Sequence, residues 1–229
     1  MAVPHFDPRL IPVDAIDTHL PVVDATELQA DALARRFARP PRWQPELPGD
    51  WTATPDKLVR QAAVLVPILV GANPTVLLTQ RTAHLTSHPG QIAFPGGRID
   101  PQDRDAADAA QREAWEEVGL ERRFLTVLGN LPVYATGSGY NVTPVVALVQ
   151  SGFSIRPNSH EVADVFEVPL SHFTNPANHR WHTMEWEQRR RQWLSMPYWE
   201  ERPHAEPTER FVWGVTAGIL RNFYRFLLA

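Results

Sequence analysis

The chain has 229 residues, of which 43% are hydrophobic, and its formal net charge is −4. These values fit one soluble domain with an N-terminal extension, because no apolar run approaches the roughly 18 residues that a membrane span needs, and the acidic balance gives no general attraction for nucleic acid. Cysteine is absent, which excludes disulfides and thiolate metal sites, and the N-terminus has no signal-peptide pattern, so we expect a cytoplasmic protein.

Residues 1–56 are expected to form an extension that packs against a main domain of residues 57–229. Residues 1–23 are interrupted by prolines and lack a sustained period, which indicates a loosely ordered arm lying on the domain or on a partner. Residues 42–56 are also rich in proline and are typical of a linker.

A helix is expected between these two segments. Asp24 is a suitable N-cap, and Glu27, three residues later, completes a capping box. Apolar residues at helical spacing continue to Phe37, and the Pro40–Pro41 pair then ends the pattern. The sequence therefore predicts a helix over residues 24–37.

The main domain begins with two apolar runs that predict buried strands. Residues 62–70 and 75–80 are separated by a Gly-Ala-Asn-Pro turn, so we expect a hairpin in a mostly buried sheet. Residues 81–91 are polar and predict a long loop. A short apolar strand, residues 92–94, then leads into the Gly96–Gly97 pair, where the backbone is expected to turn tightly near a helix.

The segment after the two glycines predicts a strong helix. Asp103 and Asp105 are both suitable N-caps, the alanines that follow favour helix formation, and Gly119 suits the C-terminal end. Glu113, Glu116 and Glu117 lie on one face of this helix, and like charges so placed destabilise an isolated helix by roughly 0.2 to 0.5 kcal/mol per pair.

A bound cation would offset that repulsion. Carboxylate oxygens, with no cysteine in the chain and no histidine in the helix, favour Mg²⁺ or Mn²⁺ over zinc. A cation held by so few protein groups normally completes its shell with water and substrate phosphate, so the pattern indicates phosphate chemistry. The alternative is a solvated acidic helix face, which the neighbouring glycine pair makes the weaker interpretation.

Residues 124–131, 142–149 and 161–170 have strand character, and a turn rich in glycine and serine is expected at residues 136–140. The basic and aromatic residues between positions 171 and 210 fit a surface hairpin, which we favour over a nucleotide-binding surface.

Apolar residues at helical spacing predict a core-packing helix over residues 216–228. A sheet with a helix on each side, in mixed order along the chain, gives an α/β sandwich.

The glycine pair and the acidic helix together resemble the Nudix box. The second half of the box pattern is matched at Arg112, Glu113, Ala114, Glu116, Glu117, Gly119 and Leu120. The first half departs from it, because the early acid, counted from Gly97, falls on Asp103, and Arg112 comes one residue late. The resemblance implies a Nudix-type α/β/α sandwich with a mixed β-sheet between helices.

The residues before the box are similar to the coenzyme A (CoA) diphosphatase branch of the Nudix family. The similarity lies in Leu77–Arg81, Leu85, His88, Gly90–Gln91 and Phe94–Gly97, and also in residues 136–139 and 212–217. That branch implies hydrolysis of the diphosphate of CoA or a CoA derivative, giving 3′,5′-ADP and 4′-phosphopantetheine, with Mg²⁺ or Mn²⁺ as cofactor.

The resemblance also implies roles for individual residues. The metal would be held by Glu113, Glu116, Glu117 and the carbonyl group of Gly96. Arg112 would pair with a neighbouring carboxylate and hold the helix to its loop. The attacking water would be oriented by Glu113, Glu117 or Glu161, and Glu161 fits a solvent-facing strand start equally well. Substrate contacts are expected from Arg81, as a diphosphate clamp, and from His88, Gln91, Gly97, Thr136 and Ser138.

Three other functions are weighed against this one. A Nudix hydrolase for ADP-ribose or a dinucleotide would be expected to lack the segment 77–91, and a non-catalytic nucleotide sensor would be expected to lose box carboxylates that are present here. Processing of RNA is disfavoured by the acidic balance. We therefore expect a small-molecule nucleotide as partner, and the sequence leaves the monomer and the homodimer both open.

Overall fold

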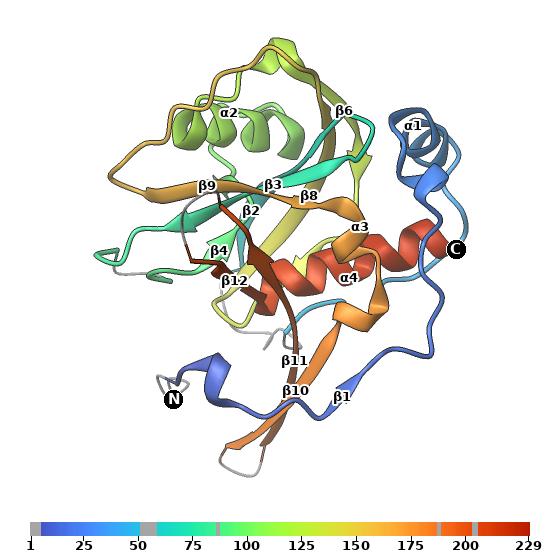
Figure 1. Ribbon diagram of the computed structural model, residues 1–229. Helices are drawn as coiled ribbons and strands as arrows, with labels where there is room; N and C mark the ends of the chain where they lie inside the picture. Colours follow the sequence, from blue (N-terminus) through green and yellow to red (C-terminus); the bar gives the residue numbers. More distant parts are fainter. Residues whose placement is uncertain (1–5, 51–58, 86–87, 187–188, 203–205) are drawn as a thin grey trace.

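The computed structural model describes residues 6–50, 59–85, 88–186, 189–202 and 206–229, which form two β-sheets with a long helix between them (Figure 1). The predicted boundary at residue 56 lies outside these described residues. Among the helices of the described ranges, none is long and apolar enough to cross a membrane.

The larger sheet has eight strands of mixed direction. Its central strand β2 (Arg60–Leu69) runs parallel to β8 (Tyr140–Val149) and antiparallel to β3 (Thr75–Arg81) and β5 (Gly96–Arg98). The other strands are β4 (Ile92–Ala93), β6 (Leu125–Asn130), β7 (Tyr134–Ala135) and β9 (Val162–Pro169). The predicted β2–β3 hairpin is confirmed only near its turn, because farther along β3 pairs with β4 on that edge and β2 pairs with β5.

Helices cover both faces of this sheet, as the predicted α/β sandwich requires. Helix α2 (Ala106–Val118) packs on one face through Ala110 and Ala114, whose small side chains let the helix lie close to Ala63 of β2. Helix α4 (Gly214–Leu228) covers the opposite face with an apolar stripe that includes Phe223. The smaller helices are α1 (Ala30–Ala38) and α3 (Leu170–Phe173), and 3-10 turns occur at Pro8–Leu10, Ala25–Leu28, Arg122–Phe124 and Pro176–Asn178.

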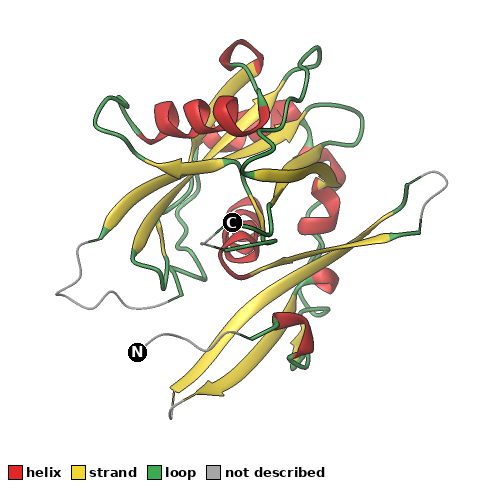
Figure 2. Ribbon diagram, turned by 90° about the vertical axis from the view of Figure 1, so that its left-hand side faces the viewer, coloured by secondary structure: helices red, strands yellow, loops and turns green. Residues whose placement is uncertain are grey.

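A second, antiparallel sheet lies on the far side of α4, and the sequence does not predict it. Its four strands are β1 (Ala15–Ile16), β10 (Arg180–Trp186), β11 (Arg189–Glu200) and β12 (Thr208–Trp213). The hairpin expected between positions 171 and 210 is present as β10–β11, and Figure 2 shows it reaching away from the α/β body. It is not a surface element throughout, because Leu194 and Met196 are buried. Leu194, Met196 and Val212 share one core with α4, so that helix is buried from both sides.

The helix predicted over residues 24–37 is wrong in its first half. The side chain of Asp24 accepts the N–H of Thr26 at 2.8 Å, and Gln29 is extended, with φ −71° and ψ 151°. Helix α1 therefore begins only at Ala30. Because Asp24 bonds a donor two residues ahead, it starts a tight 3-10 turn, and the chain bends before the α-helix.

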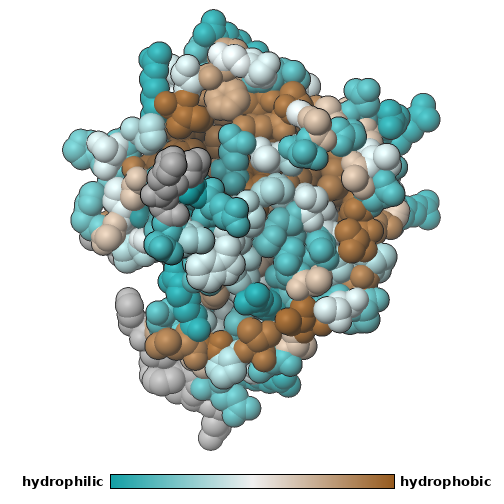
Figure 3. All heavy atoms as spheres, in the orientation of Figure 1, coloured by the Kyte–Doolittle hydropathy of each residue, from teal (hydrophilic) through white to brown (hydrophobic). Residues whose placement is uncertain are grey.

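A buried ion pair and the apolar contacts of Leu20 and Val23 tie the N-terminal arm to the core. Leu10, Val13 and Ile16 are exposed, and Figure 3 shows a row of apolar residues where Figure 1 draws the arm. These side chains face outward and do not anchor it. Asp17, by contrast, is buried and lies 2.9 Å from the guanidinium of Arg221 in α4.

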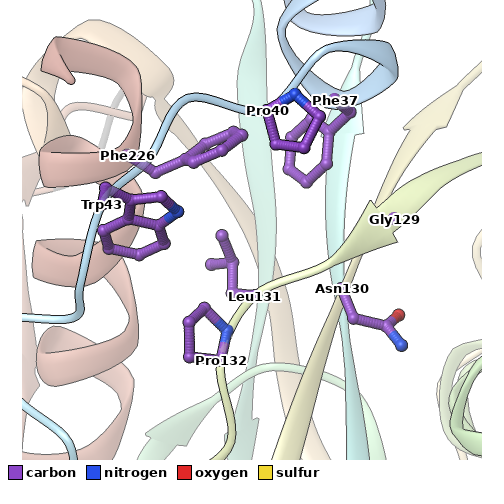
Figure 4. A pocket seen from close by; sticks show the side chains of 8 residues that line it. All are labelled: Phe37, Pro40, Trp43, Gly129, Asn130, Leu131, Pro132 and Phe226. Carbon is purple, nitrogen blue, oxygen red and sulfur yellow. The ribbon is translucent and has the colours of Figure 1, made fainter.

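An apolar cavity of about 340 Å³ lies near the C-terminal end of α4, beside α1 (Figure 4). Three aromatic side chains pack around it, with ring centroids 4.8 Å apart for Phe37 and Phe226 and 5.4 Å apart for Trp43 and Phe226. No charged side chain is among its lining residues, and none of them comes from α2. The cavity is therefore unsuited to an anionic substrate and is separate from the acidic helix.

Candidate active site

Helix α2 is delimited by the residues that the sequence proposes for its ends. Asp105 is the N-cap, because its side chain accepts the N–H of Asp108 at 2.8 Å, and Gly119 ends the helix with φ 72°. Of the two predicted caps the structure thus uses Asp105. Asp103 does not cap the helix and instead accepts hydrogen bonds from Arg112.

The predicted reversal of the backbone occurs just before the two glycines, since β4 and β5 run in opposite directions, and Gly96 and Gly97 themselves lie in strand β5. What requires glycine here is close approach. A Cβ on Gly97 would lie 2.5 Å from the carboxylate of Glu113, and a Cβ on Gly96 would lie 2.5 Å from the carbonyl oxygen of Ala63. Strand β5 therefore lies directly against the acidic face of α2.

Gly97→Ala is expected to lower kcat/KM by roughly 10- to 100-fold, because the added methyl group displaces the Glu113 carboxylate from its place beside β5. Gly71→Ala is the matched control, since a Cβ at that turn meets nothing within 4 Å. Kinetics and melting temperature should be measured for both variants. Equal activity in the two would contradict the close fit between β5 and α2.

Glu117 is the most enclosed of the three box acids, with 5% of its surface exposed. Its Oε2 accepts the N–H of Gly96 at 3.1 Å, and its Oε1 lies 3.9 Å from Nη1 of Arg81. Burial raises the pKa of Glu117 to about 7, although the Gly96 N–H opposes the rise, and the charge of Glu113 adds to it. A carboxylate perturbed in this way is a strong candidate for the reacting centre.

Arg112 joins the box helix to its flanking strand and loop. It contacts the carboxylate of Asp103 through Nε at 3.0 Å and Nη2 at 2.9 Å, which confirms the predicted pairing with a neighbouring acid. Its Nη1 lies 3.0 Å from both Glu113 and Glu116, and its Nη2 donates to the carbonyl oxygen of Arg98 at 3.1 Å. Arg112 thus orients two of the box acids and fixes β5 beside them.

Glu161 is brought to the box acids from outside the box. Its carbonyl oxygen accepts the N–H of Thr82 at 2.9 Å, which places it beside the end of β3. Burial is the main cause of the raised pKa of Glu113, and the charges of Glu116 and Glu161 add to it. Glu161 also contributes to the raised pKa of Glu117. These carboxylates therefore share one region, and the catalytic role of Glu161 stays a prediction.

Arg81 places a positive charge opposite Glu117. Its backbone N–H donates to the carbonyl oxygen of Gln91 at 2.9 Å, so the ends of the polar loop meet beside the site. Its Nε is buried and has no hydrogen-bond partner among the described residues. A buried donor without a partner is costly, so this geometry suits an anionic ligand.

Three other predicted substrate contacts form no hydrogen bond with these acids among the described residues. His88 is exposed on the loop, with φ 56°, and no hydrogen bond of the described residues joins it to a box carboxylate. Thr136 and Ser138 lie in the turn between β7 and β8, with their hydroxyl oxygens 3.0 Å apart. Tyr140 and Arg98, which contact each other beside this turn, are missed by the sequence analysis. The one feature of the sequence that could have indicated Arg98 is its position directly after the glycine pair.

The acids fit a hard divalent cation, although they do not form a complete cage. Within the described part of the chain, no three acidic or histidine side chains are close enough together to make a finished metal centre. Glu113 and Glu117 nevertheless carry pKa values raised by burial and by neighbouring negative charge, which is the environment that a cation would relieve. Such a donor set suits Mg²⁺ or Mn²⁺ completed by water and substrate phosphate.

The chain matches known proteins over most of its length. The NUDIX domain family matches residues 59–211. The Nudix hydrolase NudL of Escherichia coli K12 is 44% identical over 166 residues, covering 71% of this chain and 80% of that protein. The NudL protein of Pectobacterium atrosepticum is 43% identical over 184 residues, covering 79% of this chain and 88% of that protein.

Among solved structures, the Ap4A hydrolase of C. elegans in a binary complex is 23% identical, with a TM-score of 0.43. It covers 51% of this chain and 85% of its own. The match is partial, and the family assignment therefore depends on the sequence comparisons.

Proposed function

This chain belongs to the NUDIX domain family, and from that premise we propose that it hydrolyses the diphosphate bond of CoA or a CoA derivative, releasing 3′,5′-ADP and 4′-phosphopantetheine or its acyl form. The family makes it a hydrolase of phosphorus-containing anhydrides that acts on a nucleoside diphosphate derivative. The finer proposal, CoA as substrate, depends on one observation. Arg81, which faces Glu117, belongs to the segment 77–91 that resembles the CoA diphosphatase branch.

The reaction is a substitution at phosphorus. The oxygen of water bonds to one phosphorus atom, the bridging P–O bond breaks, and the other phosphate leaves with the bridging oxygen. A divalent cation held by Glu113, Glu116, Glu117 and the Gly96 carbonyl would supply charge neutralisation and an acidified water. One of the carboxylates in this region, Glu113, Glu117 or Glu161, accepts the proton of the attacking water.

The arginines have separate tasks in this proposal. Arg81 binds a diphosphate oxygen and offsets the negative charge that develops on the leaving group, as its buried Nε lacks a partner among the described residues. Arg112 acts on the reaction through the acids that it holds, because its hydrogen bonds are to Asp103, Glu113 and Glu116.

A substrate panel tests the proposal. CoA, acetyl-CoA, ADP-ribose, NADH and a diadenosine polyphosphate are offered with Mg²⁺ and then with Mn²⁺, and the products are identified by mass. We expect kcat/KM for CoA or acetyl-CoA to exceed the other values, with release of 3′,5′-ADP. Preference for ADP-ribose or a dinucleotide would retain the Nudix chemistry and refute CoA as the substrate.

A further inference from the structure

Two arginines lie against one tyrosine beside strand β5. The guanidinium carbon of Arg60 lies 4.2 Å from the ring centroid of Tyr140, and that of Arg98 lies 5.9 Å from it. Nε of Arg98 donates to the hydroxyl group of Tyr140 at 3.1 Å. Nη2 of Arg60 donates to the carbonyl oxygen of Ser138 at 3.3 Å. Both guanidinium groups are therefore held in place by neutral partners.

Neither cation is neutralised within the described residues. No carboxylate there forms an ion pair with Arg60 or Arg98, although Arg81 and Arg112 each pair with at least one. Asp50 is a carboxylate close to the turn at Gly137, but its hydrogen bonds are with other groups. It accepts the hydroxyl group of Tyr134 at 2.8 Å and the N–H of Gly137 at 3.3 Å. The two terminal nitrogens of Arg98 thus remain available for a bidentate contact, which is the geometry that arginine uses for phosphate.

This pair of arginines is reached along the outer edge of β5. The N–H of Gly96 and the carbonyl oxygen of Arg98 both bond to side chains of α2, Glu117 and Arg112, so this edge faces the box acids. Arg98 lies two residues beyond Gly96, which is about 7 Å along a strand. Opposite Arg98 in the pairing is Ala62, which packs in the core on the α4 side of the sheet. Because directly opposed residues of an antiparallel pair point to the same face, the Arg98 side chain leaves β5 on the α4 side, whereas Glu113 lies on the α2 side. A ligand that passes from the acids around this edge to the α4 side therefore meets Arg98.

We propose that Arg60 and Arg98, positioned by Tyr140, bind a second phosphate group of the substrate, a monoester on the same nucleoside that carries the diphosphate. Two adjacent unpaired guanidinium groups match the double charge of a phosphate monoester. A substrate with the diphosphate alone, such as ADP-ribose, would leave this site unused. If the substrate is CoA, as the proposed function states, the bound group is its 3′-phosphate.

The test compares CoA with 3′-dephospho-CoA, which lacks only that phosphate. The wild type is expected to favour CoA by roughly 10- to 100-fold in kcat/KM. The double variant Arg60→Leu/Arg98→Leu is expected to bring this ratio close to one by losing activity on CoA. Arg39→Leu removes an exposed arginine at the end of α1 and is expected to keep the wild-type ratio.

The outcomes separate this inference from the proposed function. Equal kcat/KM for the two substrates in the wild type, or equal loss on both in the double variant, would overturn the second-phosphate site while CoA hydrolysis stands. If neither compound is cleaved, the proposed function fails, and calorimetry with 3′,5′-ADP and 5′-AMP decides the site. Tighter binding of 3′,5′-ADP that the double variant loses supports it, and equal binding of the two nucleotides overturns it.

Discussion

Glu117→Gln is expected to lower kcat/KM by at least about a hundredfold on whichever substrate the wild type cleaves. Glutamine keeps the shape of the side chain but removes the negative charge that would hold a cation or accept a proton. The fold is expected to remain intact. Burial raises the pKa of Glu117 and so favours its neutral form, which glutamine imitates. Steady-state kinetics together with a thermal melt would measure both properties.

Glu121→Gln is the control for this variant, because Glu121 follows the same helix but pairs with Arg123 at the surface. It is expected to keep wild-type activity. A fully active Glu117→Gln protein would remove Glu117 from the reaction. A Glu117→Gln protein that melts well below the wild type would instead indicate a structural role.

Arg221→Met is expected to lower the free energy of unfolding by about 3 to 5 kcal/mol, because it leaves buried charge without a partner. Arg221 is 1% exposed, and it contacts Asp17 at 2.9 Å and Glu46 at 2.7 Å and 3.0 Å. Burial alone would raise the pKa of Glu46, but Arg221 and Arg225 outweigh it and lower the pKa to about 2. Urea denaturation followed by circular dichroism measures the loss.

Arg225→Met provides a matched control, because Arg225 lies one turn later on α4 and pairs with the same Glu46. Arg225 is 34% exposed at its side chain, so its loss is expected to cost no more than about 1 kcal/mol. Equal destabilisation by the two variants would show that the buried charge does not hold the arm. A larger effect for Arg221→Met would tie the arm, through Asp17 and Glu46, to the stability of the whole domain.

Local patterns predict the elements whose signals lie within the element itself. The apolar runs become strands β2, β3 and β8, and the alanine-rich segment with its end residues becomes α2. The second sheet has no such signal, because β1 pairs with β10 more than 160 residues later in the chain, as in Ala15 opposite Trp181. The early start predicted for α1 is wrong because of a local contact. Asp24 accepts the N–H of Thr26, two residues ahead, and so begins a 3-10 turn instead of the α-helix.

The same distinction holds at the site. The three box acids and Arg112 are predictable because helical spacing alone places them on neighbouring positions. Burial of Glu117 against Gly96, and the contact of Arg60 with Tyr140, depend on strand pairing that no local pattern encodes. The glycine pair is predicted next to a reversal of the chain, which the structure places just before it, but its close packing against Glu113 and Ala63 depends on the fold.

The most direct test of CoA hydrolysis at this site is the mass of the products formed from CoA and Mg²⁺ in ¹⁸O-labelled water. We predict 3′,5′-ADP and 4′-phosphopantetheine, with one ¹⁸O atom in the phosphate of one of them, and an initial rate of their formation at least about a hundredfold lower for Glu117→Gln under the same conditions. Intact CoA, in a preparation that cleaves ADP-ribose or a diadenosine polyphosphate, would contradict it.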